Sequence, residues 1–296
     1  MEIAAAIEPV FSMTEAKTDP PPGVTWIASY PKSGNTWVRF FLGRLFQGDG
    51  FSINIARHHF PYMLNYILVD KDYTQVDLDS PAVVEEVAAQ WIPIQKLIRY
   101  GDFNACRGRL FLKTHTARVN INGHSFTNAE HTDRAIYIIR DPRDVLVSLS
   151  HYYDLTLSAA ADLMLHKGLF PRGRAMPEFW GDWALNVASW RNFKQRPLLL
   201  LRYEDLLADP GVEFRRLLDF LGWTDPDAEI EAAIADTQLD ALQRQEREHG
   251  FAEKPIGEHL FFRRGVAGGW KEHPDQASIR RIEDKFGETM ASLGYA

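Results

Sequence analysis

Cysteine is nearly absent from this chain, and long apolar runs and a basic excess are missing altogether. Cys106 is the single cysteine in 296 residues, so neither an intrachain disulfide nor a cysteine-based metal site can form. No segment reaches the roughly 20 apolar residues that a membrane-spanning helix requires. Lys and Arg total 33 against 40 Asp and Glu, a formal net charge of −7. A chain-wide basic surface for nucleic acid or an anionic membrane is therefore excluded.

The N-terminal residues also lack the features of a secretory leader. Glu8 interrupts a short apolar stretch, and no basic segment precedes it. With the near absence of cysteine, this predicts a cytoplasmic protein. Residues 1–22 are expected to form a flexible lead-in that ends in the stiff spacer Pro20-Pro21-Pro22. Because 45% of the residues are hydrophobic, the chain can bury one large α/β core or two smaller ones.

Patterns typical of buried strands alternate with amphipathic helical patterns along the chain. Strands are predicted at residues 24–28, 108–113, 134–140 and 198–203. Helices are predicted at about residues 37–46, 81–98, 142–152, 181–195, 211–221, 226–236 and 276–293. Residues 155–180 are predicted to be rich in loops, and residues 247–274 to form a long functional loop. The alternation predicts a central, mostly parallel sheet with helices on both faces.

The first chemically informative segment is the loop Tyr30-Pro31-Lys32-Ser33-Gly34-Asn35-Thr36-Trp37 between a strand and a helix. It is not a Walker A loop, because its lysine precedes the glycine. Backbone N–H groups at a helix N-terminus, two hydroxyls and one ammonium can nevertheless hold a phosphate. The alternative is a plain strand-to-helix turn with an exposed lysine.

The second segment, Arg140-Asp141-Pro142-Arg143-Asp144, joins a predicted strand to a predicted helix. Arg140 lies at the carboxyl end of the strand, where open α/β sheets bind ligands, and Ser148 lies two turns along the helix. Asp141 is expected to cap the helix, with Pro142 in its first turn and Asp144 placed to close a capping box. By themselves, Arg143 and Asp144 fit a solvated arginine and a capping residue.

The third segment, Phe262-Arg263-Arg264-Gly265-Val266-Ala267-Gly268-Gly269-Trp270-Lys271, combines arginines with glycines. Glycine lets a backbone close over a ligand, and arginine recognises phosphate through a planar fork of donors. A basic surface loop is the alternative for this segment alone.

Taken in this order, the three segments resemble the cytosolic-type sulfotransferase family, whose donor is 3′-phosphoadenosine-5′-phosphosulfate (PAPS). The resemblance spans roughly residues 24 to 271. It implies one α/β sulfotransferase domain over residues 23–296, with a central, mostly parallel sheet and a P-loop-like phosphosulfate loop. It places Lys32, Ser33, Gly34, Asn35, Thr36 and Trp37 around the 5′ side of the donor, Arg140, Ser148, Arg263, Arg264 and Gly265 at its 3′-phosphate, and Tyr203 at its adenine. Thr237 matches a threonine that follows a helix in the family.

The segment Lys113-Thr114-His115 matches the family's Lys-Thr-His catalytic segment. A neutral imidazole suits the removal of a proton from an acceptor hydroxyl near pH 7. The resemblance therefore implies His115 as general base, Lys32 at the leaving-group oxygen and Lys113 at the sulfuryl oxygens. It implies PAPS as donor, the 3′,5′-bisphosphate PAP as product, and no required metal. The expected acceptor is a small apolar or aromatic molecule that offers a hydroxyl rather than an amine.

Two departures from the family pattern bear on these expectations. The third segment has Arg264 where lysine is common and Gly269 where aspartate is common, which removes a carboxylate that could order the loop. Residues 271–276 also depart from the family's dimerisation segment, so a monomer and a homodimer both stay open. A small-molecule P-loop kinase would need Gly-Lys-Ser/Thr, and a non-catalytic nucleotide-binding module would not need His115 or Lys32.

Overall fold

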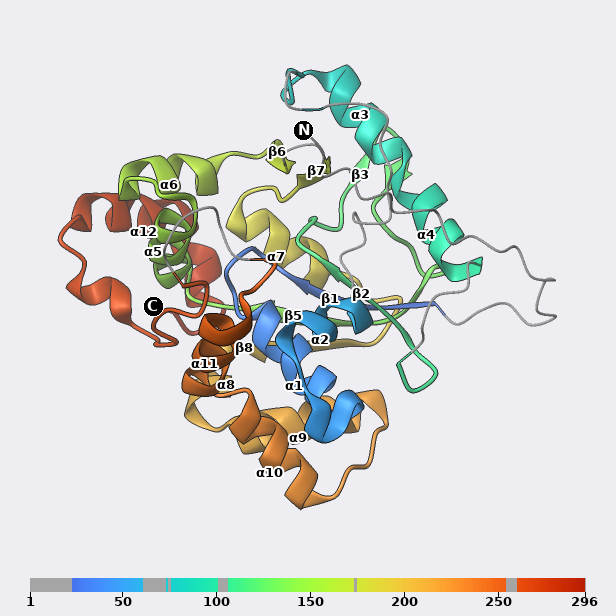
Figure 1. Ribbon diagram of the computed structural model, residues 1–296. Coiled ribbons are helices and arrows are strands. Elements are labelled where there is room, and N and C mark those ends of the chain that lie inside the picture. The colour runs from blue at the N-terminus through green and yellow to red at the C-terminus, as the bar shows by residue number, and fades with distance from the viewer. Residues whose placement is uncertain are drawn as a thin grey trace, which may run out of the picture.

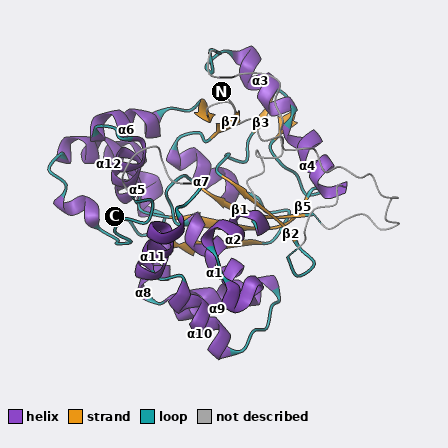
Figure 2. Cartoon of the chain, viewed as in Figure 1, coloured by secondary structure: helices purple, strands orange, loops and turns teal. Residues whose placement is uncertain are grey.

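A parallel sheet of four strands, in the order β2-β1-β5-β8, lies at the centre of the molecule (Figures 1 and 2). The computed structural model describes residues 23–60, 73, 76–100, 106–172, 175–253 and 260–295. The central strands are β1 Val24–Ser29, β2 Leu110–Thr114, β5 Thr132–Ile139 and β8 Leu198–Arg202. All three pairings are parallel, so the carboxyl ends of the four strands lie at one edge. The predicted parallel sheet is confirmed.

Successive side chains of the central strands supply two separate cores. Ile27 and Ile136 point to one face, which packs against α1 Asn35–Gln47, α8 Tyr203–Ala208, α9 Pro210–Leu221 and α10 Asp227–Asp236. Their neighbours Trp26 and Tyr137 point to the opposite face. That face packs against α3 Pro81–Ala89, α4 Trp91–Tyr100, α5 Pro142–Tyr153, α6 Leu157–Leu165, α7 Trp183–Arg191 and α12 Gln276–Ala291. The two-residue period of an extended strand explains why these strands are apolar throughout.

The remaining elements are short or lie around the sheet. They are α2 Ile53–His59, α11 Leu239–His249, the hairpins β3 Asn120–Ile121 with β4 His124–Ser125 and β6 Leu169–Arg172 with β7 Ala175–Phe179, and the 3-10 turns Gly48–Gly50 and Gly269–Glu272. Buried Phe40, Leu242 and Phe262 join α1 and α11 to the segment that follows residue 260.

Three expectations about secondary structure are wrong. The predicted helix 81–98 is two helices, because Pro93 has no N–H to donate to the carbonyl of Ala89. Residues 155–180 hold α6 and the β6–β7 hairpin, and Thr156 caps α6 by accepting from the Ala159 N–H at 3.2 Å. The predicted loop 247–274 starts late, because α11 continues to His249.

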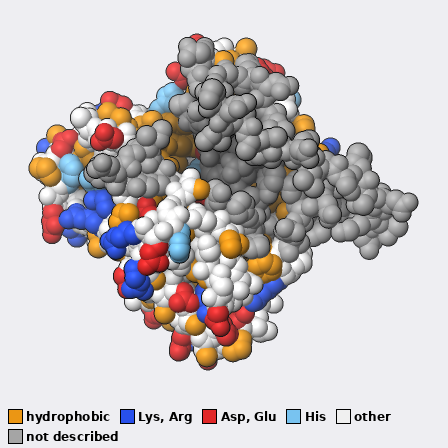
Figure 3. Space-filling view, in the orientation of Figure 1, with side chains coloured by type: hydrophobic (Ala, Val, Ile, Leu, Met, Phe, Trp, Pro, Cys, Tyr) orange, Lys and Arg blue, Asp and Glu red, His pale blue; other side chains and the backbone are white. Residues whose placement is uncertain are grey.

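The expected lead-in, residues 1–22, lies outside the described residues. Within the part of the chain that is described, no helix is both long and apolar enough to cross a membrane. Figure 3 shows Lys and Arg side chains gathered to the left of the position of α11, with Asp and Glu side chains among them. The described residues on this face therefore carry both signs of charge rather than one extended basic surface.

Candidate active site

A cavity of about 910 Å³ opens at the carboxyl edge of the sheet. Its volume suits a small-molecule ligand of nucleotide size. Its walls come from the β1–α1 loop, the end of β2, the start of α5, α11 and residues 261–269. The predicted site residues that line it are Lys32, Gly34, Asn35, Thr36, Trp37, Lys113, His115, Arg140, Ser148, Tyr203, Thr237, Arg263, Arg264 and Gly265. Ser33 is the one predicted site residue that does not line the cavity, and only 1% of its surface is exposed.

Within the described part of the chain, the β1–α1 loop next to the cavity contains polar groups without hydrogen-bond partners. Lys32 and Gly34 adopt positive φ angles of 66° and 99°. A Cβ atom on Gly34 would approach Cδ2 of Tyr203 to 2.5 Å, so this position requires glycine. Among the described residues, the buried Ser33 hydroxyl has no hydrogen-bond partner, and no side chain caps the N-terminus of α1. A bound anion would satisfy such groups, and the loop therefore fits a phosphate.

Two residues of this loop differ in what their side chains do. The Asn35 amide donates to the carbonyl of Ile27 at 3.0 Å, and this bond ties α1 to β1 at the edge of the cavity. Trp37 meets Tyr203 edge to face, with ring centroids 6.2 Å apart. The Arg140 guanidinium lies 4.4 Å from the centroid of the Tyr203 ring. These aromatic and planar groups form one wall suited to a flat base.

Positive charge is concentrated around Lys32. Its Nζ lies 4.0 Å from the ring centroid of Tyr152 and 4.2 Å from that of Phe261. Burial, with the charges of Lys113 and Arg140, lowers the pKa of Lys32 to about 7. Burial and neighbouring arginines also lower the pKa of Arg263. The cations of this cavity lower one another's pKa values because they repel. An anionic ligand would relieve that repulsion, so the cavity favours one.

Glu253 is the acidic counterpart of this cluster, and sequence reasoning missed it. Its carboxylate lies 3.1 Å from Lys113 Nζ and receives two bonds from Arg39, at 2.7 and 2.9 Å. Burial opposes its ionisation, yet Arg39 and Lys113 together hold the pKa of Glu253 well below its usual range. Arg39 is only 1% exposed, so this carboxylate is its structural counter-charge.

His115 follows β2 and is fixed from three sides. Its Nδ1 lies 2.9 Å from the carbonyl oxygen of Ser29, its backbone N–H donates to Glu178 at 3.3 Å, and its carbonyl accepts from Asn186 at 2.9 Å. The Ser29 hydroxyl also lies 3.2 Å from Nδ1, but the carbonyl oxygen is closer and can only accept, so these contacts favour a neutral ring with its proton on Nδ1. The lone pair is then on Nε2.

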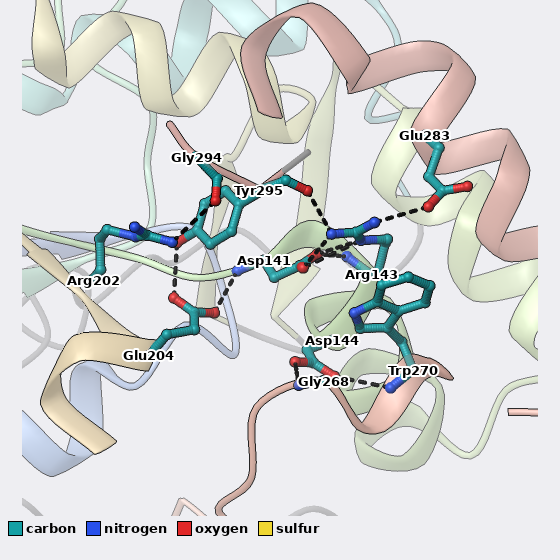
Figure 4. Close-up of polar contacts among 10 residues, drawn as sticks. All are labelled: Asp141, Arg143, Asp144, Arg202, Glu204, Gly268, Trp270, Glu283, Gly294 and Tyr295. Atoms are coloured by element: carbon teal, nitrogen blue, oxygen red, sulfur yellow. Dashed lines mark hydrogen bonds and ion pairs between the residues drawn. The ribbon is translucent and has the colours of Figure 1, made fainter. Parts of the chain in front are cut away.

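The start of α5 confirms part of its predicted capping. The Asp141 carboxylate accepts from the Arg143 N–H at 2.9 Å, and Pro142 occupies the first turn. Asp144 does not close the capping box, because the Asp141 N–H donates to Glu204 instead. Asp144 accepts from the backbone N–H groups of residues 268 and 270 (Figure 4).

Arg143 is also not the solvated residue that local pattern favours. It pairs with Asp141 at 2.7 Å and with Glu283 at 2.9 Å. Its guanidinium lies 3.9 Å from the centroid of the Trp270 ring, and it donates to the carbonyl of Tyr295 (Figure 4). The residue thus connects α5, α12 and the last described residue of the chain.

Comparison with known proteins identifies the family of this chain. The family described as the sulfotransferase domain matches residues 22–294. Cytosolic sulfotransferase 1 of Danio rerio is 27% identical over 275 residues, which cover 89% of this chain and 81% of that relative. Sulfotransferase 1A1 of Bos taurus is 26% identical over 271 residues, covering 90% of this chain and 82% of that relative.

Two solved structures share the fold. A mouse sulfotransferase, SULT7A1, complexed with PAP has a TM-score of 0.55 and 21% identity, and the match covers 91% of this chain and 85% of that one. Retinol dehydratase in a complex with retinol and PAP has a TM-score of 0.59 and 19% identity, covering 91% of this chain and 82% of that one.

A family match over nearly the whole chain sets aside the kinase and the non-catalytic module. In the described ranges, no group of three or more His, Cys, Asp or Glu side chains could hold a metal ion, and independence from metal stays a prediction. The chain belongs to the sulfotransferase domain family and is a PAPS-dependent sulfotransferase.

Proposed function

We propose that this enzyme transfers the sulfuryl group of PAPS to a hydroxyl of a small apolar or aromatic acceptor, with His115 as general base. Lys32, the N-terminus of α1 and the hydroxyls of Ser33 and Thr36 hold the 5′-phosphosulfate. Arg140, Ser148, Arg263, Arg264 and Gly265 hold the 3′-phosphate, and Trp37 and Tyr203 hold the adenine. Thr237 and its neighbours on α11 complete this wall, although the Thr237 hydroxyl itself donates to the carbonyl of Ala233 at 2.7 Å.

The chemistry is an in-line displacement at sulfur. The acceptor oxygen forms a bond to sulfur as the bond from sulfur to the bridging phosphate oxygen breaks, and PAP leaves. The acceptor proton passes to Nε2 of His115. Negative charge grows on the bridging oxygen, so the Lys32 ammonium stabilises the transition state more than the ground state. Lys113, which pairs with Glu253 at 3.1 Å and lines the same cavity, interacts with the sulfuryl oxygens.

One observation carries this assignment. The Ser29 carbonyl oxygen, 2.9 Å from His115 Nδ1, favours the tautomer that has its lone pair on Nε2. Only that tautomer, with the ring held by β1, can accept a proton through Nε2. His115, Lys32 and Lys113 line one cavity, so a base and two cations meet where the transfer would occur.

The acceptor class follows from the other lining residues. Tyr152, Tyr153, Trp180 and Val147 line the cavity beside His115. The Trp180 ring stacks on Phe170 with centroids 4.0 Å apart, which fixes it as a flat apolar wall. Retinol dehydratase, which shares the fold, is known in complexes with retinol and with androsterone, both apolar alcohols. An apolar or aromatic alcohol is therefore a better acceptor than a sugar.

His115→Ala tests the base. We expect PAP to bind the variant as it binds the parent protein, while turnover falls about 10²- to 10⁴-fold, the contribution typical of a positioned base. His249→Ala is the matched control, because His249 is exposed at the end of α11. The test compares the release of PAP from PAPS with a phenol, a steroid alcohol and a sugar as acceptors. Comparable turnover in His115→Ala would remove this residue as base.

A further inference from the structure

Two buried carboxylates hold residues 260–270, here called the nucleotide loop, at its two ends. At the C-terminal end, the Asp144 carboxylate of α5 accepts from the Gly268 N–H at 2.6 Å and the Trp270 N–H at 3.1 Å (Figure 4). At the N-terminal end, the Glu246 carboxylate of α11 accepts from the N–H groups of Phe261 and Phe262, at 2.6 and 3.0 Å. Each carboxylate therefore binds a pair of backbone donors on the same loop.

Both carboxylates are almost inaccessible to solvent. Asp144 is 4% exposed and Glu246 is 3% exposed. Charge-assisted bonds from backbone N–H groups are stronger than neutral ones and are weakened little by water at such sites. Asp144 also lines the cavity, where a negative charge opposes the binding of an anion. A carboxylate in that place is unfavourable unless its bonds to the loop are worth more than the repulsion.

The segment between the two carboxylates carries Arg263, Arg264 and Gly265. Gly265 and Gly268 have φ angles of 58° and 78°, and Gly269 follows, so the chain here has much conformational entropy to lose. Further bonds fix its carbonyl groups: Arg140 donates to Val266 at 2.9 Å, and Gln243 donates to residues 262 and 263 at 2.9 and 3.0 Å. The side chains of Arg263 and Arg264 are exposed, so the hydrogen bonds of the backbone set the position of their Cα atoms.

We infer that Asp144 and Glu246 are positioning residues that preorganise the nucleotide loop for the 3′-phosphate of the donor. The inference rests on the proposed function, which assigns Arg263, Arg264 and Gly265 to that phosphate. Asp144 supplies from α5 the ordering carboxylate that Gly269 cannot supply from within the loop. Fixing the loop before binding lowers the entropy that binding must remove.

The test uses Asp144→Asn and Glu246→Gln, which keep side-chain size but place an NH₂ group opposite a backbone N–H. Matched controls are Glu248→Gln, an exposed residue of α11, and Asp284→Asn, an exposed residue of α12. Calorimetry measures the Kd of PAP and of adenosine 5′-phosphate, which lacks the 3′-phosphate. Hydrogen exchange measures the protection of the amides of residues 261, 262, 268 and 270 without any ligand.

We expect each test variant to weaken PAP binding about tenfold or more, since a hydrogen bond to a charged group is worth roughly that factor. The Kd of adenosine 5′-phosphate should change less than about twofold, because this ligand lacks the 3′-phosphate. The KM for PAPS should rise with little change in kcat. In Asp144→Asn, exchange should speed up at residues 268 and 270, and in Glu246→Gln at residues 261 and 262.

Three results overturn the inference: unchanged amide exchange in both variants, equal losses for the two nucleotides, or a fall in kcat with KM unchanged. If the parent protein fails to bind PAP, the proposed function fails instead, and the amide exchange still decides whether the carboxylates order the loop. Should one variant fail to fold, the other tests the same claim at the opposite end of the loop.

Discussion

The depressed pKa of Lys32 makes donor binding depend on pH. In the unliganded protein, burial together with Lys113 and Arg140 lowers the pKa of Lys32 from 10.5 to about 7. A bound phosphosulfate or phosphate places negative charge beside Lys32 and offsets the repulsion by Lys113 and Arg140, so the pKa of Lys32 rises again on binding. Above pH 7 the unliganded side chain is mostly neutral, whereas the liganded one stays charged. Binding must then take up a proton, and affinity falls as pH rises.

The size of the effect follows from the two pKa values. If the pKa returns on binding to its ordinary 10.5, the Kd of PAP rises about 50-fold between pH 7 and pH 9. That factor corresponds to about 2 kcal/mol. The phosphates contribute little, since a phosphate monoester has its second pKa near 6.

Isothermal titration calorimetry in buffers of different ionisation enthalpy measures both quantities. We expect uptake of about one proton per PAP bound near pH 8.5, from the pKa values above. Lys32→Met is the control, because it removes the titrating group and should bind weakly with a nearly flat pH dependence. A Kd in the parent protein that stays constant from pH 7 to 9, with no proton uptake, would refute this account of the cluster.

Two further predictions concern the walls of the cavity. Gly34→Ala should abolish PAP binding and destabilise the protein by clearly more than the roughly 1–2 kcal/mol of a left-handed residue, because its Cβ would lie 2.5 Å from Tyr203. Gly222→Ala, at a left-handed position with φ 69° and no atom within 4 Å of the added Cβ, isolates the backbone cost, and equal losses in urea unfolding would refute the steric argument. Glu253→Gln should lower stability by about 3–5 kcal/mol, because it leaves the buried Arg39 without its counter-charge. Glu248→Gln should change the same unfolding curve by less than about 0.5 kcal/mol, and an equally small change for Glu253→Gln would contradict the pairing.

The sheet and the position of most site residues could be predicted because their signals are local. A buried strand, a turn and an amphipathic helix occur within residues 24–47, and the cap at Asp141 and Pro142 lies within a few residues of the strand it follows. In parallel strands the carboxyl ends share one edge, so Lys32, His115 and Arg140 had to lie near one another.

The contacts that hold the cavity together could not be predicted in this way. Arg39 and Glu253 are 214 residues apart, and Asp144 and Gly268 are 124 residues apart. Neither pair has a local pattern, since each depends on how helices pack after the sheet has formed. The capping-box expectation for Asp144 was wrong for the same reason. The Asp141 N–H donates to Glu204, and Asp144 instead accepts from the nucleotide loop.

The most direct test of the central claim follows the sulfur atom. The protein is incubated with PAPS labelled with ³⁵S and a panel of phenols, steroid alcohols, sugars and amines, and labelled products are separated and counted. We predict a labelled sulfate ester of an apolar or aromatic alcohol, one PAP released for each ester formed, and loss of labelling in His115→Ala. No labelled product with any acceptor, together with a melting temperature that PAP does not change, would contradict the account.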